Sequence, residues 1–228
     1  MSRVAETSVG DAIARRRSVR AFLDTPVDPA VLRHVLERAL RAPSNSNIQP
    51  WLVHLVTGDA LVRLKAATKA RSVHPPVFDD RAFPIYPEPI LDAHGDRRFA
   101  CGERQYGARG IAREDAEGRL TYVYRNFQFF GAPAGLFLFV EPGMGPSQWA
   151  DLGIFLQTVM LLLVEEGLDS CAQISWSLVH QSVREVLGIG PEPILYCGLA
   201  IGHADLADPI NAIVADRVRF DEVVTIHD

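Results

Sequence analysis

Two clusters of arginine stand near opposite ends of this 228-residue chain. The first reads Arg15-Arg16-Arg17-Ser18-Val19-Arg20 and the second Arg217-Val218-Arg219, in a chain whose formal net charge is −5. A guanidinium presents a planar fork of donors that suits phosphate and carboxylate groups. We interpret Arg16, Ser18 and Arg219 as donors to a bound anion. The alternative is a solvated helix end, because positive charge at a helix C-terminus offsets the helix dipole.

A polar run lies between the two arginine clusters. Residues 43–51 read Pro-Ser-Asn-Ser-Asn-Ile-Gln-Pro-Trp, which places hydroxyls and amides in a turn-prone segment that ends on an aromatic ring. Such side chains can hydrogen-bond the polar edge of a flat ligand, while arginines hold its anionic tail. Together the two patterns predict a phosphorylated, planar organic cofactor.

Several familiar sites are missing from the sequence. The glycines at 143–145 and 188–190 lack the third glycine of a dinucleotide-binding fingerprint. The sequence has no phosphate-binding loop, no His-Glu-x-x-His and no Gly-x-Ser-x-Gly motif, and its seven histidines are scattered. Cys101, Cys171 and Cys197 are too widely spaced for a metal or thiol-exchange motif, so we expect reduced thiols and no metal. The acidic balance argues against nucleic-acid binding.

The composition is that of a folded soluble protein, with 48% hydrophobic and 22% charged residues. The first twenty residues lack the apolar segment of a secretory signal. The most apolar stretch, residues 152–164, is shorter than the roughly 20 residues that span a bilayer, so we interpret it as a buried helix. We therefore expect a cytoplasmic protein that does not contact a membrane.

Hydrophobic periodicity predicts a mixture of helices and strands in one domain over residues 1–228, with no internal repeat. Helices are expected over residues 9–16, 29–40, 60–70, 147–166 and 178–187. Strands are expected over residues 52–57, 134–140, 170–173 and 194–201. Asp28 with Pro29 is a start signal, and Ser147 and Gly167 are expected to cap and end the long helix.

Residues 71–126 differ in texture from the rest of the chain. Five prolines crowd into residues 75–89, so we expect irregular structure there, with one helix around residues 97–107. Long excursions in compact domains are often lids over a site, and the alternative is a disordered insertion. The segment carries many phenylalanines and tyrosines, which favours the lid.

Five stretches, taken in order, resemble the FMN-dependent nitroreductase family, and in particular its nitrobenzoate reductase-like branch. They span nearly the whole chain and cover residues 16–22, 42–51, 126–133, 166–173 and 217–223. The resemblance implies an α+β fold, a three-layer α/β/α sandwich with a central, mostly antiparallel sheet flanked by helices. It also implies an interlocked homodimer with FMN at the subunit interface, and a C-terminal arm, residues 212–228, directed toward the partner subunit.

The resemblance also implies which residues bind FMN. The phosphate and ribityl chain would be held by Arg16, Arg17 and Ser18, and Arg20 would lie beside the N1/O2 edge, where it stabilises negative charge on the reduced flavin. The remaining residues fall into three groups: a turn that reaches FMN from the other subunit, a segment along the N5 side, and a C-terminal pair that closes the phosphate site. They are Ser44, Asn45, Ser46 and Asn47; Gln173, Ile174 and Ser175; and Arg217 and Arg219.

The family activity transfers hydride from NAD(P)H to FMN and then to a nitroaromatic or quinone, in a ping-pong sequence. No side-chain nucleophile or base is expected, because the flavin carries the chemistry. Two alternatives stay open: another flavin reaction on the same scaffold, such as ene reduction, reductive dehalogenation or flavin breakdown, and a non-catalytic flavin-binding or redox-sensing dimer. Arg97 or Arg98 is the candidate to contact the pyrimidine edge of the flavin. Phe99, Tyr106 and Trp176 are the candidates to contact the small aromatic substrate.

Overall fold

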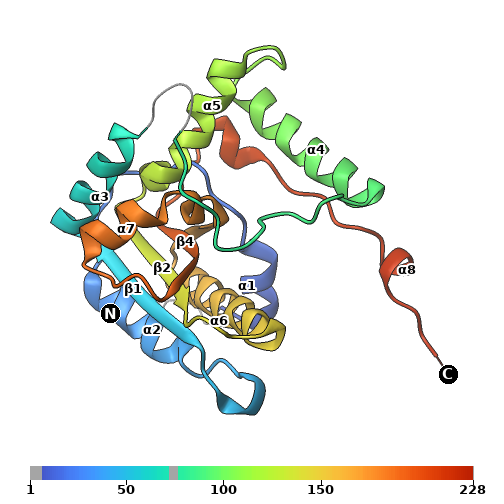
Figure 1. Cartoon of the computed structure of the whole chain (residues 1–228). Coiled ribbons are helices and arrows are strands. Elements are labelled where there is room, and N and C mark those ends of the chain that lie inside the picture. Colours follow the sequence, from blue (N-terminus) through green and yellow to red (C-terminus); the bar gives the residue numbers. More distant parts are fainter. Residues whose placement is uncertain (1–6, 72–76, 228) are drawn as a thin grey trace.

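A computed structural model describes residues 7–71 and 77–227 of the chain (Figure 1). Residues 1–6, 72–76 and 228 lie outside the described residues, and they include the first prolines of the predicted irregular segment. The centre of the fold is a four-stranded sheet in the order β1-β2-β4-β3. Every pairing between its strands is antiparallel. The strands are β1 Trp51–Thr57, β2 Ala134–Val140, β3 Asp169–Gln173 and β4 Ile194–Gly202.

β2 is buried along its whole length, as its unbroken apolar sequence predicts. Side chains alternate along a strand, so Leu136 and Leu138 face one side of the sheet and Phe137 and Phe139 the other. Both faces therefore need a cover of helices.

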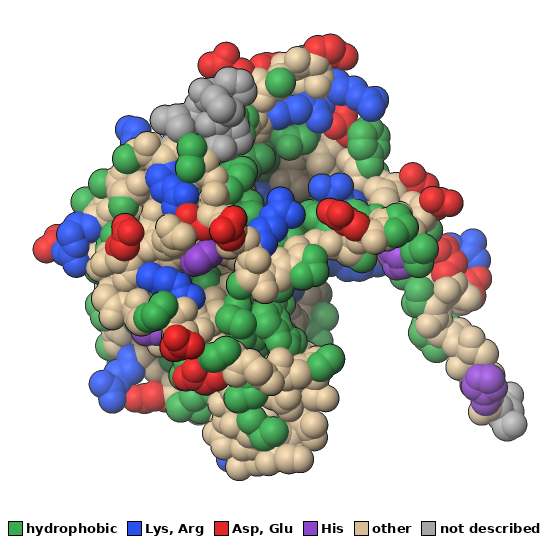
Figure 2. All heavy atoms as spheres, viewed as in Figure 1, with side chains coloured by type: hydrophobic (Ala, Val, Ile, Leu, Met, Phe, Trp, Pro, Cys, Tyr) green, Lys and Arg blue, Asp and Glu red, His purple; other side chains and the backbone are tan. Residues whose placement is uncertain are grey.

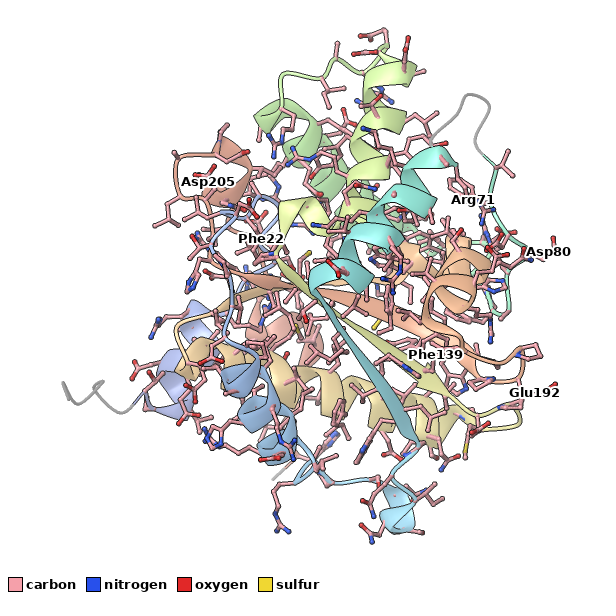
Figure 3. All side chains as sticks on the ribbon, turned by 90° about the vertical axis from the view of Figure 1, so that its left-hand side faces the viewer. Phe22, Arg71, Asp80, Phe139, Glu192 and Asp205 are labelled. Carbon is pink, nitrogen blue, oxygen red and sulfur yellow. The ribbon has the colours of Figure 1, made fainter. Side chains whose placement is uncertain are left out.

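Helices pack on both faces of the sheet. Figure 3 shows α2 and α6 on one side of the strands and α3 and α7 on the other. The predicted three-layer α/β/α arrangement is confirmed. The helices of the first layer are α1 Val9–Arg15, α2 Pro29–Ala39 and α6 Pro146–Glu165, and those of the second are α3 Gly58–Ala70 and α7 His180–Leu187.

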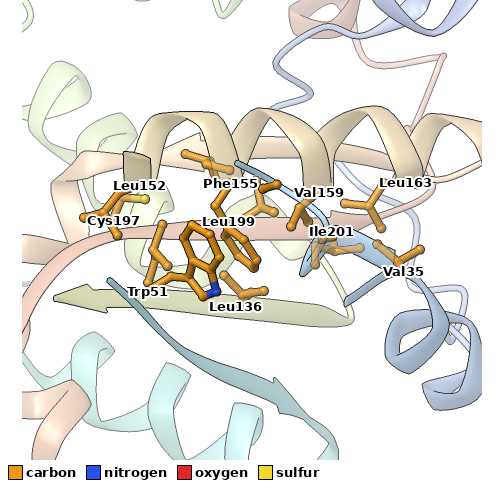
Figure 4. Packing of buried hydrophobic residues seen from close by; sticks show 14 of the residues in the cluster. Val35, Trp51, Leu136, Leu152, Phe155, Val159, Leu163, Cys197, Leu199 and Ile201 are labelled. Atoms are coloured by element: carbon orange, nitrogen blue, oxygen red, sulfur yellow. The ribbon is translucent and has the colours of Figure 1, made fainter. Parts of the chain in front are cut away.

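α6 is the central helix of the first layer. Its 20 residues make it long and apolar enough to cross a membrane by length and composition alone, which exceeds the thirteen-residue stretch singled out in the sequence. Its side chains instead pack on the sheet, where Phe155 stacks on Trp51 of β1 with ring centroids 4.9 Å apart (Figure 4). α6 is therefore a core helix.

Two expected helix starts are wrong. α6 is capped two residues earlier than expected, by Gly145 instead of Ser147, and Pro146 takes the first helical position, because proline suits a position whose amide needs no partner. The helix expected from residue 178 begins at His180, after a 3₁₀ segment Ile174–Val179. At its end Gly188 takes the left-handed conformation that glycine adopts without strain, φ 67°.

The excursion over residues 71–126 contains two helices where one was expected, α4 Asp92–Ala108 and α5 Ala116–Tyr124. Glycines at 95, 102 and 107 weaken the helical signal of α4. The start of α5 is fixed by Asp115, whose carboxylate accepts a hydrogen bond from the Gly118 amide at 2.8 Å. In Figure 1 both helices project beyond the sheet and its two covering layers.

Asp79 fastens the start of the excursion to the body. Its carboxylate accepts hydrogen bonds from Arg71 at 2.7 Å and from the Gln181 amide at 2.8 Å. Figure 3 shows Arg71 and Asp80 at this junction, beside α7. The excursion is thus tied to the second helical layer, and farther along Phe83 packs against Trp149 of α6.

The end of the chain leaves the body. After a short 3₁₀ turn, Pro209–Ala212, the arm runs outward to α8 Phe220–Val223 (Figure 1). Its large apolar side chains, Phe220, Val223, Val224 and Ile226, are exposed. In the single chain, as far as its residues are described, these four side chains stay open to solvent.

The contact between Gly198 of β4 and the buried Trp176 indole supports a stability test. A Cβ at residue 198 would lie 2.3 Å from the indole ring. Gly198→Ala is therefore expected to lower the free energy of unfolding by about 1–3 kcal/mol, because an overpacked core must shift. Urea unfolding followed by circular dichroism measures it. Gly107→Ala, with open space around it, is the control, and equal stability of the two variants would contradict this packing.

Candidate functional site

A pocket of about 990 Å³ lies between the C-terminal ends of α1 and α6, the helix α4 and the start of the C-terminal arm. Figure 2 shows the molecule hollowed below α4, on the side where the arm leaves. Six arginines line the pocket, with Asp169 as the single acidic residue among the described lining: Arg15, Arg16, Arg17, Arg20, Arg104 and Arg217.

The segment after α1 carries four of the predicted cofactor ligands into this pocket. α1 ends at Arg15, and Arg16 is its C-cap. The chain then runs beside β3, where Ser18 pairs with Ser170 and the Val19 amide donates to the Ser170 carbonyl at 3.1 Å. The sheet edge thereby fixes the backbone from which the predicted ligands project: Arg16, Arg17, Ser18 and Arg20.

Asn211, which sequence reasoning missed, holds the same segment from the other side. Its buried side chain accepts a hydrogen bond from the Arg20 amide at 2.8 Å and donates one to the Ala21 carbonyl at 2.7 Å. Its backbone carbonyl accepts a bond from the Arg17 guanidinium at 2.7 Å. The available signal was Asp208-Pro209, which begins the 3₁₀ turn that positions Asn211.

The pocket carries positive charge with little compensation. Among the described residues, Arg104 alone of the six lining arginines forms an ion pair, with Asp216 at 2.6 Å. The carboxylate of Asp169 accepts the Ala204 amide instead of pairing with an arginine. Guanidinium groups gathered in this way favour an anion among them.

The pocket arginines also act on the thiol of Cys171, on the strand beside the pocket. Burial raises the pKa of the Cys171 thiol on β3, while Arg20, the hydrogen bond with Ser18, and Arg16 act in the opposite direction. The effect of burial outweighs them, so Cys171 stays a neutral thiol.

The polar turn predicted to bind the cofactor lies elsewhere in the same chain. The 3₁₀ helix Asn45–Asn47 lies beside the N-terminal part of α6, where the backbone N–H of Asn45 donates to the Asp151 carboxylate. Gln157 of α6 lines the pocket, and Asp151 lies six residues before it on the same helix. Asp151 is therefore roughly 9 Å away along the helix axis and on a different face of the helix. One chain therefore does not bring Ser44–Asn47 to the arginines.

The segment predicted along the N5 side follows the strand that starts at the pocket. β3 begins at Asp169, and Gln173 lies about 13 Å farther along the strand. The Gln173 side chain is buried: its amide group donates to the Asn126 carbonyl at 2.8 Å and its oxygen accepts from Trp176. Ile174 and Ser175 follow, half-buried, at the start of the 3₁₀ segment.

Other candidates are engaged outside the pocket. Arg219 lies on the exposed arm and pairs with Asp221, whereas Arg217 reaches the pocket wall. Arg98 stacks over Tyr86, and Arg97 contacts His94. The aromatic substrate candidates also have other contacts. Arg113 stacks over the Phe99 ring and Arg119 over the Tyr106 ring. Trp176 is buried in the core.

A second pocket, of about 530 Å³, is lined by α5 and by the segment that leads into it. Its arginines, Arg109 and Arg125, share the lining with Asp115 and Glu117, so the charges cancel. Two buried nitrogens of Arg109 have no hydrogen-bond partner among the described residues, but its third pairs with Asp208 at 2.8 Å. In the described part of the chain no cluster of His, Cys, Asp and Glu could hold a metal ion. Because acidic residues do not balance the arginines of its lining, the arginine pocket is a better candidate for an anion site than the second pocket.

The fold and the pocket define an α+β protein with an arginine-lined pocket at one edge of its antiparallel sheet. The chain belongs to the nitroreductase family, whose model matches residues 13–203. It is 34% identical over 205 residues to 4-nitrobenzoate reductase of Pseudomonas putida, an alignment that covers 90% of this chain and 89% of that protein.

Two solved structures are similar over nearly their whole length. One is the FMN- and NADPH-dependent nitroreductase NfnB from Sphigopyxis sp. strain HMH, at 47% identity and a TM-score of 0.92, with 97% of this chain and 99% of that chain covered. The other is the FMN-dependent nitroreductase NfnB from Mycobacterium smegmatis in complex with NADPH, at 32% identity and a TM-score of 0.90, with 97% and 100% covered.

The three cysteines differ in their expected reactivity. Burial raises the pKa of Cys197 to about 12 and also raises that of Cys171, whereas Cys101 is partly exposed on the pocket wall. At pH 8 one thiol per folded chain is therefore expected to react with an aromatic disulfide reagent, because the thiolate is the nucleophile. Cys101→Ser should abolish the reaction, and denaturant should expose every thiol that remains. Fast reaction of the folded Cys101→Ser variant would contradict the burial described.

Proposed function

We propose that this protein is an FMN-dependent oxidoreductase that takes hydride from NAD(P)H and reduces nitroaromatic or quinone-type substrates. The observation that carries the proposal is the pocket of uncompensated arginines in a chain of the nitroreductase family. FMN, when bound, would supply the chemistry of hydride transfer between NAD(P)H and the oxidant. The residues of the chain bind and orient the two reactants.

The donors in the pocket fit the phosphate of FMN. Arg16, Arg17 and Ser18 supply guanidinium and hydroxyl groups to an anion, and Arg217 lies on the same wall. Arg20 supplies a positive charge next to the start of β3, where it favours negative charge on a flavin ring. Gln173, Ile174 and Ser175, at the far end of β3, would flank the N5 side.

We propose that the working form is an interlocked homodimer in the cytoplasm. The turn Ser44–Asn47 carries exposed polar groups far from the pocket of its own chain, which is the arrangement required of a segment that serves the partner's flavin. The arm, residues 212–228, exposes apolar side chains that a second chain would cover, and Arg219 would join the phosphate site when the arm docks. Residues 1–228 form one FMN-binding domain, with the excursion 71–126 as a lid over the substrate side.

The substrate class rests on the relatives. The similar protein of Pseudomonas putida is named for 4-nitrobenzoate, and a similar protein of Ectopseudomonas oleovorans, 33% identical over 218 residues, for nitrobenzene. Both are small nitroaromatic compounds, so a nitroarene is the first oxidant to offer. NADPH is named for both NfnB proteins, and is the first reductant to offer.

Removing the phosphate donors is the first test. The double variant Arg16→Ala with Ser18→Ala is expected to lose FMN during purification while remaining folded, because charge-assisted donors supply much of the affinity for a phosphate. The absorbance of the purified protein measures occupancy. Arg33→Ala, which breaks the exposed ion pair with Glu37 on α2, serves as the matched control. Full flavin occupancy in the double variant would show that the phosphate lies elsewhere.

The redox activity has a separate test. Anaerobic addition of NADPH is expected to bleach the yellow colour of the FMN-loaded protein, and nitrobenzene or 4-nitrobenzoate is expected to restore it. Stopped-flow absorbance follows both half-reactions, and a panel of quinones and enones defines the range of oxidants. A flavin that NADPH and NADH both leave unbleached would favour a binding or sensing protein over an enzyme.

A further inference from the structure

The carboxylate of Asp151 is one that the proposed cofactor site does not use. It lies near the N-terminal end of α6 and is 4% exposed. Both of its oxygens lie 3.1 Å from the backbone nitrogen of Asn45, and this carboxylate forms no other hydrogen bond or ion pair with the described residues. A buried carboxylate is costly unless it accepts hydrogen bonds, so its position is tied to the turn above it.

That turn has a backbone that needs support. Ser46, Asn47 and Gln49 have φ of 50°, 59° and 53°, in the left-handed region that residues with a side chain rarely adopt. Such conformations persist only where surrounding contacts over-determine them. One support comes from within the turn, because the backbone N–H of Gln49 donates a hydrogen bond to the Ser44 hydroxyl at 2.9 Å. The other comes from α6, through Asp151.

The consequence concerns the direction in which the turn presents its polar groups. Asn45, Ser46 and Asn47 are exposed, and within the described part of the chain the Asn45 side chain makes a long contact with the Ser46 hydroxyl, 3.4 Å. Their presentation therefore depends on where the backbone of the turn is fixed. The Asp151–Asn45 contact fixes it to α6, the helix that packs on the sheet and whose Phe155 stacks on Trp51.

We propose that Asp151 is a positioning residue for FMN binding, and that it acts on the flavin of the partner subunit through the turn Ser44–Asn47. The proposal rests on the proposed function, because it requires that the turn contacts FMN in trans. Asp151 itself touches neither cofactor nor substrate. Its role is to hold the turn in the conformation in which the amide and hydroxyl groups meet the flavin.

The first measurement compares FMN affinity among variants of α6. Asp151→Ala is expected to raise the Kd for FMN about tenfold, which corresponds to one charge-assisted hydrogen bond. Asp151→Asn keeps an acceptor in the same space and is expected to raise it about threefold. Glu165→Gln, at the exposed end of the same helix, is the matched control and should leave Kd unchanged. Apoprotein is titrated with FMN, and quenching of flavin fluorescence gives Kd.

Circular dichroism of each apoprotein separates positioning from loss of fold. A folded Asp151→Ala variant with the wild-type Kd would overturn the proposal. If that variant does not fold, the Asp151→Asn variant decides by the same criterion. If the wild-type apoprotein itself does not bind FMN, the proposed function fails, which is a different result from an Asp151 variant that binds normally.

A hybrid dimer tests the action in trans. One chain carries Asp151→Asn with an intact arginine pocket, and the other carries Arg16→Ala and Ser18→Ala with an intact turn. If Asp151 acts through the partner, the one remaining pocket receives an unaltered turn, and its Kd should equal that of the wild type. A threefold higher Kd at this single site would place the effect within the same chain and overturn the proposal.

Discussion

The repulsion among the arginines of the pocket is the constraint on which the rest of the structure depends. Their guanidinium groups line one pocket, and in the described part of the chain one of the six forms an ion pair, Arg104 with Asp216. Like charges separate unless the backbone holds them or an anion lies between them. The chain supplies the first through two contacts, the pairing of Ser18 with Ser170 on β3 and the hydrogen bonds of the buried Asn211. The second is what the phosphate of FMN would provide.

The two parts of the proposed site sit at different ends of one rigid element. α6 has the pocket wall toward its C-terminal half and Asp151 near its start, and its apolar face is fixed by the sheet. The arginine pocket lies beside the C-terminal half of α6 and the polar turn lies beside its start, so one chain does not close both around one ligand. Two copies can do so when each offers its turn to the pocket of the other. The exposed apolar arm fits the same requirement.

The sequence predicted well what depends on short-range patterns. The unbroken apolar run of β2 and the Asp28-Pro29 start of α2 appear where expected, because burial and capping are local properties. Of the predicted phosphate ligands, Arg16, Arg17, Ser18, Arg20 and Arg217 line one pocket and Arg219 does not, and their role in binding FMN stays a prediction. Sequence reasoning missed α5, because nothing in the proline-rich texture of the excursion marked a second helix. It missed Asn211 and Asp151 because their importance arises from backbone amides distant in sequence, and no spacing rule connects residue 20 to 211 or 45 to 151.

The central claim is that two chains and two flavins form one closed unit around the arginine pockets. Native mass spectrometry of the purified protein, after FMN is supplied in slight excess, tests it most directly. The account predicts a dominant species with the mass of two chains and two FMN molecules, and joint loss of FMN and of the dimer as the collision energy is raised. A single chain that retains FMN, or a dimer that takes up none, would contradict it.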